Sequence, residues 1–190
     1  MLHKAQLTRS LKGQAVQCHV CEHYCTLQSG DWGKCGVRVN REGTVYLTVY
    51  GEAVAAHIDP IEKKPLFHFL PSTGALSVGT YGCNFTCQWC QNWQMSQVRQ
   101  REPQALGADD LSPEQIVDIC RSRDIPTIAY TYNEPTVFFE YTYDTAKLAH
   151  ERGIKNVYVS NGFMTEELLD VLTPYLDGIN IDHKGFTEAL

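Results

Sequence analysis

The chain has 190 residues, of which 43% are hydrophobic, and its formal net charge is −6 at pH 7. This length and composition suit one globular domain with a small appendage, and without lysine- or arginine-rich blocks the chain offers no electrostatic footprint for nucleic acid or an anionic membrane. The sequence also lacks an apolar run near the roughly 20 residues of a transmembrane helix, and its amino terminus lacks a signal-peptide core, so we expect a cytoplasmic protein with neither partner.

Four cysteines lie close together near the amino terminus, in the segment CHVCEHYCTLQSGDWGKC, and they are Cys18, Cys21, Cys25 and Cys35. Their close grouping favours metal ligation over disulfides or free buried thiols. Four thiolates complete a ligand set, which predicts a structural zinc site or an auxiliary iron–sulfur cluster, and the residues leave that choice open. Because the set is complete, we expect His19 and His23 to lie outside it.

We assign residues 1–43 to this Cys-rich region and residues 44–74 to a connecting segment. Alternation of Val45 and Leu47 with Tyr46 and Thr48 predicts a half-buried strand at the start of that segment. The stretch IEKKPLFHFLPSTG, with two prolines and a charged patch, reads as an ordered loop lying over the domain that follows.

From residue 75 onward, short apolar runs alternate with amphipathic segments. The runs at 75–81, 127–132, 156–159 and 178–182 are typical of parallel strands buried on both faces. Helices are expected to begin after Ser112, which heads a capping box, and after Thr165, and a third helix is expected over 139–152. These units predict an α/β fold with a parallel sheet, open or closed into a barrel.

Two further expectations concern single positions in this α/β region. Cys120 falls on the apolar face of the first helix, so we expect it to be a core thiol rather than a ligand. Residues 185–190 resemble the start of another helix, which would leave the fourth strand with an unpaired edge. We therefore expect the sequence to be the amino-terminal part of a longer protein.

The segment GTYGCNFTCQWCQNW follows the first buried strand and carries Cys83, Cys87 and Cys90 with the spacing Cys-x3-Cys-x2-Cys. A closed structural site fills four positions, so three cysteines predict a site with one coordination position open to a reacting group. Ligands in parallel α/β folds bind beyond the carboxyl ends of the strands. The next three strand ends carry polar residues, which are Asn133, Glu134, Ser160, Asn161, Asp182 and Lys184.

Each of these polar strand ends also has an ordinary structural explanation. The Asn-Glu-Pro and Ser-Asn-Gly sequences are common in turns and at helix starts, and Asp182 with Lys184 is compatible with a surface ion pair. Their shared position at the cysteine-bearing rim favours a common site.

With these motifs in place, the chain resembles the radical S-adenosylmethionine (SAM) superfamily. The longer pattern, from CHVCEHYC through DPIEKKPLFHFLPSTG, YTYNEPT, VSNGF and IDHKGF, is similar to the radical SAM enzyme of the AmmeMemoRadiSam system, an oxidoreductase related to pyruvate formate-lyase activating enzymes. The resemblance implies a partial (β/α)6 TIM-like barrel over residues 75–190, with about four β/α units present. It covers nearly the whole chain from Cys18 onward.

The resemblance also implies a role for each residue at the rim. Cys83, Cys87 and Cys90 would hold three irons of a [4Fe-4S] cluster, and SAM would chelate the fourth. Its reductive cleavage would yield a 5′-deoxyadenosyl radical that abstracts hydrogen from substrate. Among the cofactor-binding residues, Asn133 and Glu134 would meet the amino group of SAM, and Ser160 and Asn161 would lie near its ribose and carboxylate. Trp89 would lie against its adenine. Asp182 and Lys184 match the Asp-x-Lys motif on the fourth strand. His183 departs from the aliphatic residue usual between those two.

The resemblance implies an electron donor such as flavodoxin or ferredoxin. The sequence does not identify the substrate, and a protein is among the candidates. An activating enzyme that installs a glycyl radical on a partner protein is the alternative within the same chemistry. A non-catalytic module that binds zinc or iron–sulfur in both cysteine clusters is the alternative from another class.

Overall fold

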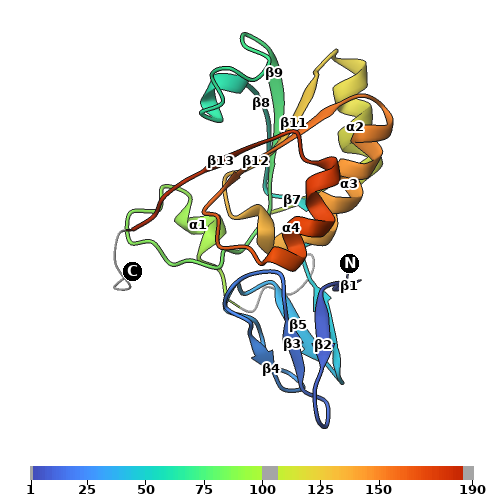
Figure 1. The fold of residues 1–190 in the computed structure, drawn as a ribbon, viewed down its shortest axis with the longest axis vertical. Helices are drawn as coiled ribbons and strands as arrows, with labels where there is room; N and C mark the ends of the chain where they lie inside the picture. Colours follow the sequence, from blue (N-terminus) through green and yellow to red (C-terminus); the bar gives the residue numbers. More distant parts are fainter. Residues whose placement is uncertain (1, 100–106, 186–190) are drawn as a thin grey trace.

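The computed structural model describes residues 2–99 and 107–185. Its main feature is a five-stranded sheet with the strand order β13-β12-β11-β9-β8 (Figure 1). The strands are β8 (Ala55–Pro60), β9 (Gly74–Gly79), β11 (Thr127–Tyr130), β12 (Lys155–Ser160) and β13 (Gly178–Ile181). The last four pair in parallel, in chain order, which confirms the predicted parallel sheet.

Strand β8 was not expected in this sheet. It pairs antiparallel with β9, from Ala55 opposite Gly79 to Pro60 opposite Gly74, and forms one edge of the sheet. The prediction of a connecting β and loop segment over residues 44–74 did not include this pairing, which makes part of the segment an edge strand of the sheet. A strand read from local pattern does not reveal its partner, because sheet pairing is set by contacts distant in sequence.

Three helices cover one side of the sheet (Figure 1), namely α2 (Pro113–Ser122), α3 (Phe139–Glu151) and α4 (Glu166–Leu172). Helix α2 starts at the predicted capping box, in which Ser112 Oγ accepts from the Gln115 amide and the Gln115 side chain accepts from the Ser112 amide. Thr165 Oγ1 likewise accepts from the Leu168 amide and begins α4. Gly153, with φ +71°, follows the end of α3.

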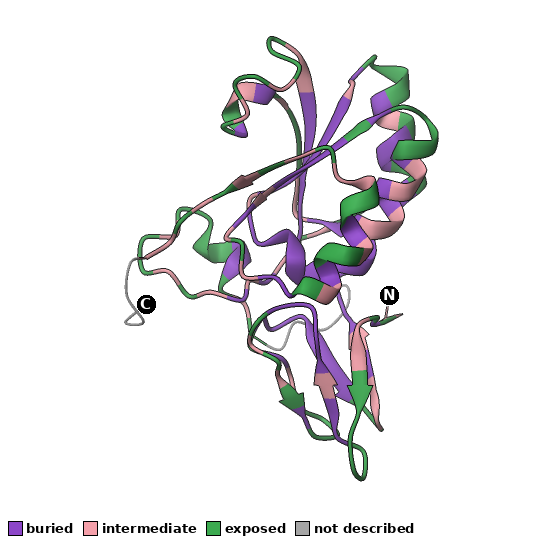
Figure 2. Ribbon diagram, viewed as in Figure 1, coloured by how far each residue is buried: buried purple, intermediate pink, exposed green. Residues whose placement is uncertain are grey.

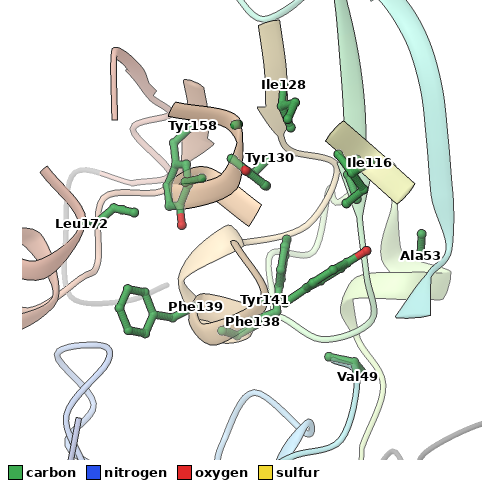
Figure 3. Close-up of a cluster of buried hydrophobic side chains, with 14 of the residues drawn as sticks. Val49, Ala53, Ile116, Ile128, Tyr130, Phe138, Phe139, Tyr141, Tyr158 and Leu172 are labelled. Carbon is green, nitrogen blue, oxygen red and sulfur yellow. The ribbon is translucent and has the colours of Figure 1, made fainter. Parts of the chain in front are cut away.

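The core lies between these helices and the sheet (Figure 3). Tyr130 and Tyr158 of neighbouring strands pack with the side chains of α2, of the 3-10 turn η2 (Pro135–Phe138) and of α3. Burial of a large apolar side chain contributes about 1.5–3 kcal/mol to the free energy of unfolding, so this cluster is the main stabilising element. Cys120 is fully buried in it, as predicted. Figure 2 shows that the central strands β9, β11 and β12 and the inner sides of the helices are the most buried parts of the domain, whereas the edge strands β8 and β13 are partly exposed.

The opposite face of the sheet is covered only in part. Ala75, Ala129 and Val157 form a small cluster there with Ile61, which begins the turn η1 (Ile61–Lys63), and with Leu66 and Phe69. The loop over 61–74 therefore packs on the sheet near the amino-terminal ends of the strands, as expected. Nearer the carboxyl ends, this face borders the cavity described below.

An N-terminal module, residues 2–49, is built from two small antiparallel sheets. One contains β1 (His3–Lys4), β6 (Thr44–Leu47) and β5 (Arg38–Arg41), and the other β2 (Thr8–Ser10), β3 (Val16–Cys18) and β4 (Thr26–Leu27). The expected boundary between residues 43 and 44 falls in the turn of the β5–β6 hairpin, so that hairpin lies wholly within the module. Two short strands, β7 (Glu52–Ala53) and β10 (Asp109–Asp110), pair antiparallel beyond it.

A buried ion pair joins the module to the helical layer. Arg38 and Glu140 are 1% and 0% exposed, and the guanidinium contacts both carboxylate oxygens, with 3.0 Å from Nη1 to Oε1. Arg38 Nε also donates to the Val137 carbonyl at 3.0 Å, and the Gln6 amide donates to Glu140 at 2.7 Å. Burial opposes the charge on Arg38, but the adjacent carboxylate outweighs this effect and raises its pKa.

No helix within the described ranges is both long enough and apolar enough to span a bilayer.

Candidate functional site

A cavity of about 800 Å³ lies at the carboxyl ends of the parallel strands. It is lined by every residue that the sequence nominated for the rim, namely Cys83, Cys87, Trp89, Cys90, Asn133, Glu134, Ser160, Asn161, Asp182 and Lys184. The structure thus brings all ten together in one place. This arrangement follows from the parallel topology, which sets successive strand ends side by side.

The cysteine loop, residues 80–92, connects β9 to the short helix α1 (Trp93–Ser96). Two glycines let it pass close to neighbouring backbone. A Cβ on Gly79 would lie 2.7 Å from the Thr131 carbonyl oxygen, and one on Gly82, where φ is +91°, would lie 2.7 Å from the Cys35 carbonyl oxygen. Only glycine fits these two positions, because real Cβ atoms do not approach so closely.

The three thiols of the loop are partly exposed toward the cavity. Burial raises the pKa of Cys83 to about 12, although the Phe85 amide, 3.5 Å from its sulfur, acts in the opposite direction. Cys90 Sγ lies 3.1 Å from Ser96 Oγ. A thiol with so high a pKa becomes a thiolate at neutral pH only when a metal replaces its proton.

Glu134 organises the strand ends on the other side of the cavity. Its Oε1 accepts from the Thr136 amide at 3.1 Å and from Ser160 Oγ at 2.8 Å, and its Oε2 accepts from the Asn161 amide at 2.7 Å. Burial raises the pKa of this carboxyl, against the effect of these hydrogen bonds. Oε2 accepts this single bond among the described residues, so it retains capacity for a further donor such as an ammonium group.

Asn133 is held by the cysteine loop itself. Its Oδ1 accepts from the Thr80 amide at 3.1 Å, and its Nδ2 donates to the Gly82 carbonyl at 2.7 Å. The side chain lines the cavity, but its polar atoms are engaged with the backbone of the loop. Asn133 therefore joins the β11 strand end to the loop that carries the cysteines.

Asp182 and Lys184 form an ion pair of 3.0 Å at the far rim, and Asp182 also accepts from Asn180 Nδ2 at 2.7 Å. Both side chains are partly exposed, so the pair adds little to the free energy of unfolding. His183 between them is exposed. Trp89 is 62% exposed at the cavity, where its ring is free to contact a ligand.

Sequence reasoning missed a polar wall that β8 and η1 contribute to the same cavity. Asp59 Oδ2 accepts from Lys64 Nζ at 2.9 Å and from the Tyr132 hydroxyl at 2.9 Å, and His57 lies beside them. Partial burial would raise the pKa of Asp59, but the hydrogen bonds from Lys64 and Tyr132 lower it below its usual range. The charged DPIEKKP stretch next to apolar residues was the available signal.

A second cavity, of about 610 Å³, lies on the other side of the cysteine loop. Cys83 and Cys87 line both cavities, so the loop is their common wall. The cationic side chains of Lys34 and Arg99 border this second space together with His23, and no Asp or Glu is among the described residues that line it. Its surroundings are therefore positive in a chain whose net charge is −6.

The four N-terminal cysteines surround a small void of about 10 Å³ beside Arg38. Burial raises the pKa of Cys21 to about 11 and that of Cys35 to about 12. In three of the four, the backbone amide two residues further along acts in the opposite direction and lowers the pKa of the thiol, namely Val20 for Cys18, His23 for Cys21 and Val37 for Cys35. Amide donors aimed at sulfur stabilise thiolates that bind metal.

Within residues 2–99 and 107–185, no three or more His, Cys, Asp or Glu side chains are placed to hold a single metal ion. An iron–sulfur cluster has no such requirement, because each cysteine binds a different iron. At the cysteine loop, the buried Asn84 Nδ2 has no hydrogen-bond acceptor among the described residues, and an acceptor there would satisfy it. The cysteine loop therefore fits a cluster with inorganic sulfide better than a lone ion.

Comparison with known proteins identifies the family of the chain. Residues 77–190, more than half of the chain, match the sequence model of the radical SAM superfamily. The chain is 41% identical over 97% of its length to the uncharacterised protein MJ0808 of Methanocaldococcus jannaschii, and 25% identical over 88% to MJ0674 of the same organism. It is 32% identical over 55% of its length to YfkA of Bacillus subtilis.

The chain spans 54% of MJ0808, 45% of MJ0674 and 28% of YfkA, which is about half or less of each relative. The family match begins within β9 and includes the cysteine loop and all three later strand ends of the rim. The chain therefore belongs to the radical SAM superfamily, whose members are enzymes that use an iron–sulfur cluster to cleave SAM reductively.

Proposed function

We propose that the chain is the catalytic part of a radical SAM enzyme of the AmmeMemoRadiSam type. The observation that carries the proposal is the cavity at the strand ends, where three cysteines with an open fourth position face the polar residues of three neighbouring strands. The partial (β/α)6 barrel is part of the same proposal, and the four parallel strands with helices on one side support it.

In this proposal, Cys83, Cys87 and Cys90 hold a [4Fe-4S] cluster, and Glu134 accepts from the amino group of SAM. When bound, the cluster and SAM supply a 5′-deoxyadenosyl radical that abstracts hydrogen from a substrate. Ser160 and Asn161, fixed by Glu134, border the ribose and carboxylate, Trp89 covers the adenine, and Asp182 with Lys184 closes the far rim. Asn133 acts by positioning the cysteine loop, because its polar atoms already bind that loop.

The test is anaerobic iron–sulfur reconstitution of the complete protein, followed by reduction with SAM present. We expect 5′-deoxyadenosine to form, and Cys87→Ala to abolish it together with cluster loading. Cys120→Ala is the matched control, because it removes a buried thiol outside the site and should leave product formation intact. Formation of 5′-deoxyadenosine by Cys87→Ala at the wild-type rate would refute the assignment.

An activating enzyme for a glycyl-radical protein is the second candidate. The observation that favours it is the exposure of Trp89 (62%) and Trp93 (58%) beside the cavity, because large exposed aromatic side chains suit contact with a protein segment. The measurement that separates the two is electron paramagnetic resonance of a partner protein after turnover. A glycyl radical on the partner identifies an activating enzyme.

We also propose that Cys18, Cys21, Cys25 and Cys35 bind a second metal centre, zinc or an auxiliary iron–sulfur cluster. Their common void supports metal-bound thiolates, and so do the neighbouring backbone amides, which lower the pKa of three of the thiols against the effect of burial. Metal and sulfide analysis of a variant lacking Cys83, Cys87 and Cys90 distinguishes the two. One zinc per chain without sulfide identifies a zinc site, iron with sulfide identifies a cluster, and no metal refutes the centre.

The electron donor is proposed to be an acidic carrier such as flavodoxin or ferredoxin, in the cytoplasm. The second cavity supports this choice, because its cationic border adjoins Cys83 and Cys87 from the side opposite the SAM cavity. Complementary charge speeds the encounter of redox partners.

A further inference from the structure

The polar wall of the strand-end cavity, formed by His57, Asp59, Lys63, Lys64 and Tyr132, has no part in the proposed binding of SAM. Its first two residues belong to β8 at one edge of the sheet, whereas the proposed SAM contacts lie on the cysteine loop and at the ends of β11, β12 and β13. Strand β8 is three strand spacings, about 14 Å, from β12. The cavity therefore extends beyond the residues proposed to hold SAM.

Lys64 is the buried cation of this wall. Its side chain is 5% exposed, and its Nζ lies 2.9 Å from Asp59 Oδ2 and 5.0 Å from the centre of the Tyr132 ring. An ammonium group carries three N–H donors, and Asp59 provides its one hydrogen-bond acceptor among the residues that the structure describes. Because a buried charge is unfavourable unless its donors are satisfied, the remaining N–H groups favour an acceptor that enters the cavity.

The wall also carries an excess of positive charge. Asp59 Oδ2 accepts from Lys64 Nζ and from the Tyr132 hydroxyl, each at 2.9 Å, and Asp59 Oδ1 lies 3.3 Å from Lys63 Nζ. One carboxylate thus faces two ammonium groups, and one positive charge is left over. On the far rim, by contrast, Lys184 is balanced by Asp182. An anionic ligand is therefore attracted to the wall.

Tyr132 is held in a strained backbone conformation. Its φ is +74°, in the left-handed region that a bulky residue seldom adopts, and its carbonyl accepts from Asn92 Nδ2 at 2.8 Å. One face of its ring lies toward Lys64, and the His57 ring is nearly perpendicular to it at 6.3 Å between ring centres. Strain of this kind costs about 1–3 kcal/mol and occurs most often at ligand sites, which supports a binding role for the wall.

We propose that this wall is the substrate subsite of the enzyme, and that Lys64 together with Lys63 binds an anionic group of the substrate, a carboxylate or a phosphate. The inference rests on the proposed function, because it takes the other side of the cavity to be occupied by SAM. Asp59 and Tyr132 are positioning residues that fix the Lys64 ammonium at the cavity. An anion bound there anchors the substrate across the cavity from Ser160.

The experiment is calorimetric titration of the complete, cluster-loaded protein with two probe anions, inorganic phosphate and malonate. We expect wild-type protein to bind at least one of them, and the tighter probe identifies the group that the substrate carries. Lys64→Met should weaken that binding about tenfold or more, since it removes the buried charge. Asp59→Asn should strengthen it, because both ammonium groups lose their competing carboxylate.

Asp59→Asn keeps the test decisive if Lys64→Met does not fold, because a folding defect cannot raise the affinity for an anion. Lys155→Met is the matched control. Lys155 Nζ also pairs with an aspartate, Asp177 at 2.7 Å, but it lies at the amino-terminal end of β12, so the affinity should match that of wild type. Equal affinity in wild type and both wall variants would place the anion elsewhere and overturn the proposal, as would the absence of anion binding.

A titration with SAM present separates a substrate subsite from the SAM site itself. The cluster is kept oxidised so that SAM is not cleaved. Anion binding that persists at saturating SAM supports the proposal, whereas displacement of the anion by SAM would assign the wall to SAM and overturn it. Failure of the proposed function is a different result, since wild-type protein would then form no 5′-deoxyadenosine on reduction, which the anion titrations do not measure.

Discussion

Glu134 is a fully buried carboxylate whose two oxygens hold the β11 and β12 strand ends together. In Glu134→Gln, one oxygen becomes an NH2 group that faces the Asn161 amide, so two donors meet. We expect the free energy of unfolding to fall by about 1–3 kcal/mol. If Glu134 accepts from the SAM ammonium, as proposed, loss of its negative charge should also weaken SAM binding, on the order of tenfold.

Urea unfolding and equilibrium SAM binding by the cluster-loaded protein test both parts. Glu151→Gln, which changes an exposed carboxylate at the end of α3, should alter neither quantity. Unchanged SAM affinity in Glu134→Gln would remove this residue from the SAM site.

Cys120 gives a pH dependence without involving the metal sites. Burial raises its pKa to about 12 from a usual value of 9.0. Between these pH values the unfolded chain has lost this proton and the folded chain has kept it, so stability falls as pH rises. We expect metal-free wild-type protein to lose up to about 1.4 kcal/mol per pH unit more than Cys120→Ala between pH 9 and pH 11.

Urea titrations of both proteins at each pH provide the comparison. The pH dependence that comes from other groups titrating at alkaline pH is the same in both proteins and cancels in the comparison, because the two chains differ at one residue. If the free energies of unfolding of the two proteins changed in parallel with pH, the Cys120 thiol would have the same pKa in the folded and unfolded states, which would contradict the prediction.

At the scale of elements, the Arg38–Glu140 pair ties β5 of the N-terminal module to α3. Removal of one partner leaves an uncompensated buried charge, so Arg38→Met or Glu140→Gln should each lower the free energy of unfolding by about 3–5 kcal/mol. Replacing both by apolar residues of similar size should recover much of the loss. A double-mutant cycle by denaturant unfolding measures the coupling, and additive single effects would contradict a direct pair.

The starts of α2 and α4 could be predicted because capping depends on residues within one turn. Strand β8 could not, since its pairing with β9 depends on the intervening loop and not on local alternation. The ten rim residues were placed together by the topology of parallel strands, whereas their roles toward SAM stay predictions. The positions of Asp59, Lys64 and Asn84 near the site could not be predicted from the sequence, because they depend on contacts with distant residues, such as Tyr132 and Asn161.

At the scale of the whole molecule, the cysteine loop lies between the strand-end cavity and the cationic second cavity. If an acidic carrier delivers its electron through the second cavity, Lys34→Glu and Arg99→Glu should slow reduction of the cluster by flavodoxin. The effect should be on the order of tenfold at low salt and shrink as ionic strength rises, because salt screens exposed charges.

Stopped-flow absorbance of the cluster follows this reaction. Arg121→Glu, an exposed charge reversal on α2, is the control, and reduction by dithionite should be the same in all variants. Equal flavodoxin rates in wild type and both cavity variants would locate the donor elsewhere.

The surroundings of the cysteine loop include all three tryptophans of the chain. Trp32 lines the second cavity, Trp89 lines the first, and Trp93 begins the helix that ends the loop. The intrinsic tryptophan fluorescence of this protein therefore reports on the region around the cysteine loop. Cluster assembly should quench it through energy transfer to the iron–sulfur chromophore, and SAM docking against Trp89 should change it again, so both steps can be followed without a label.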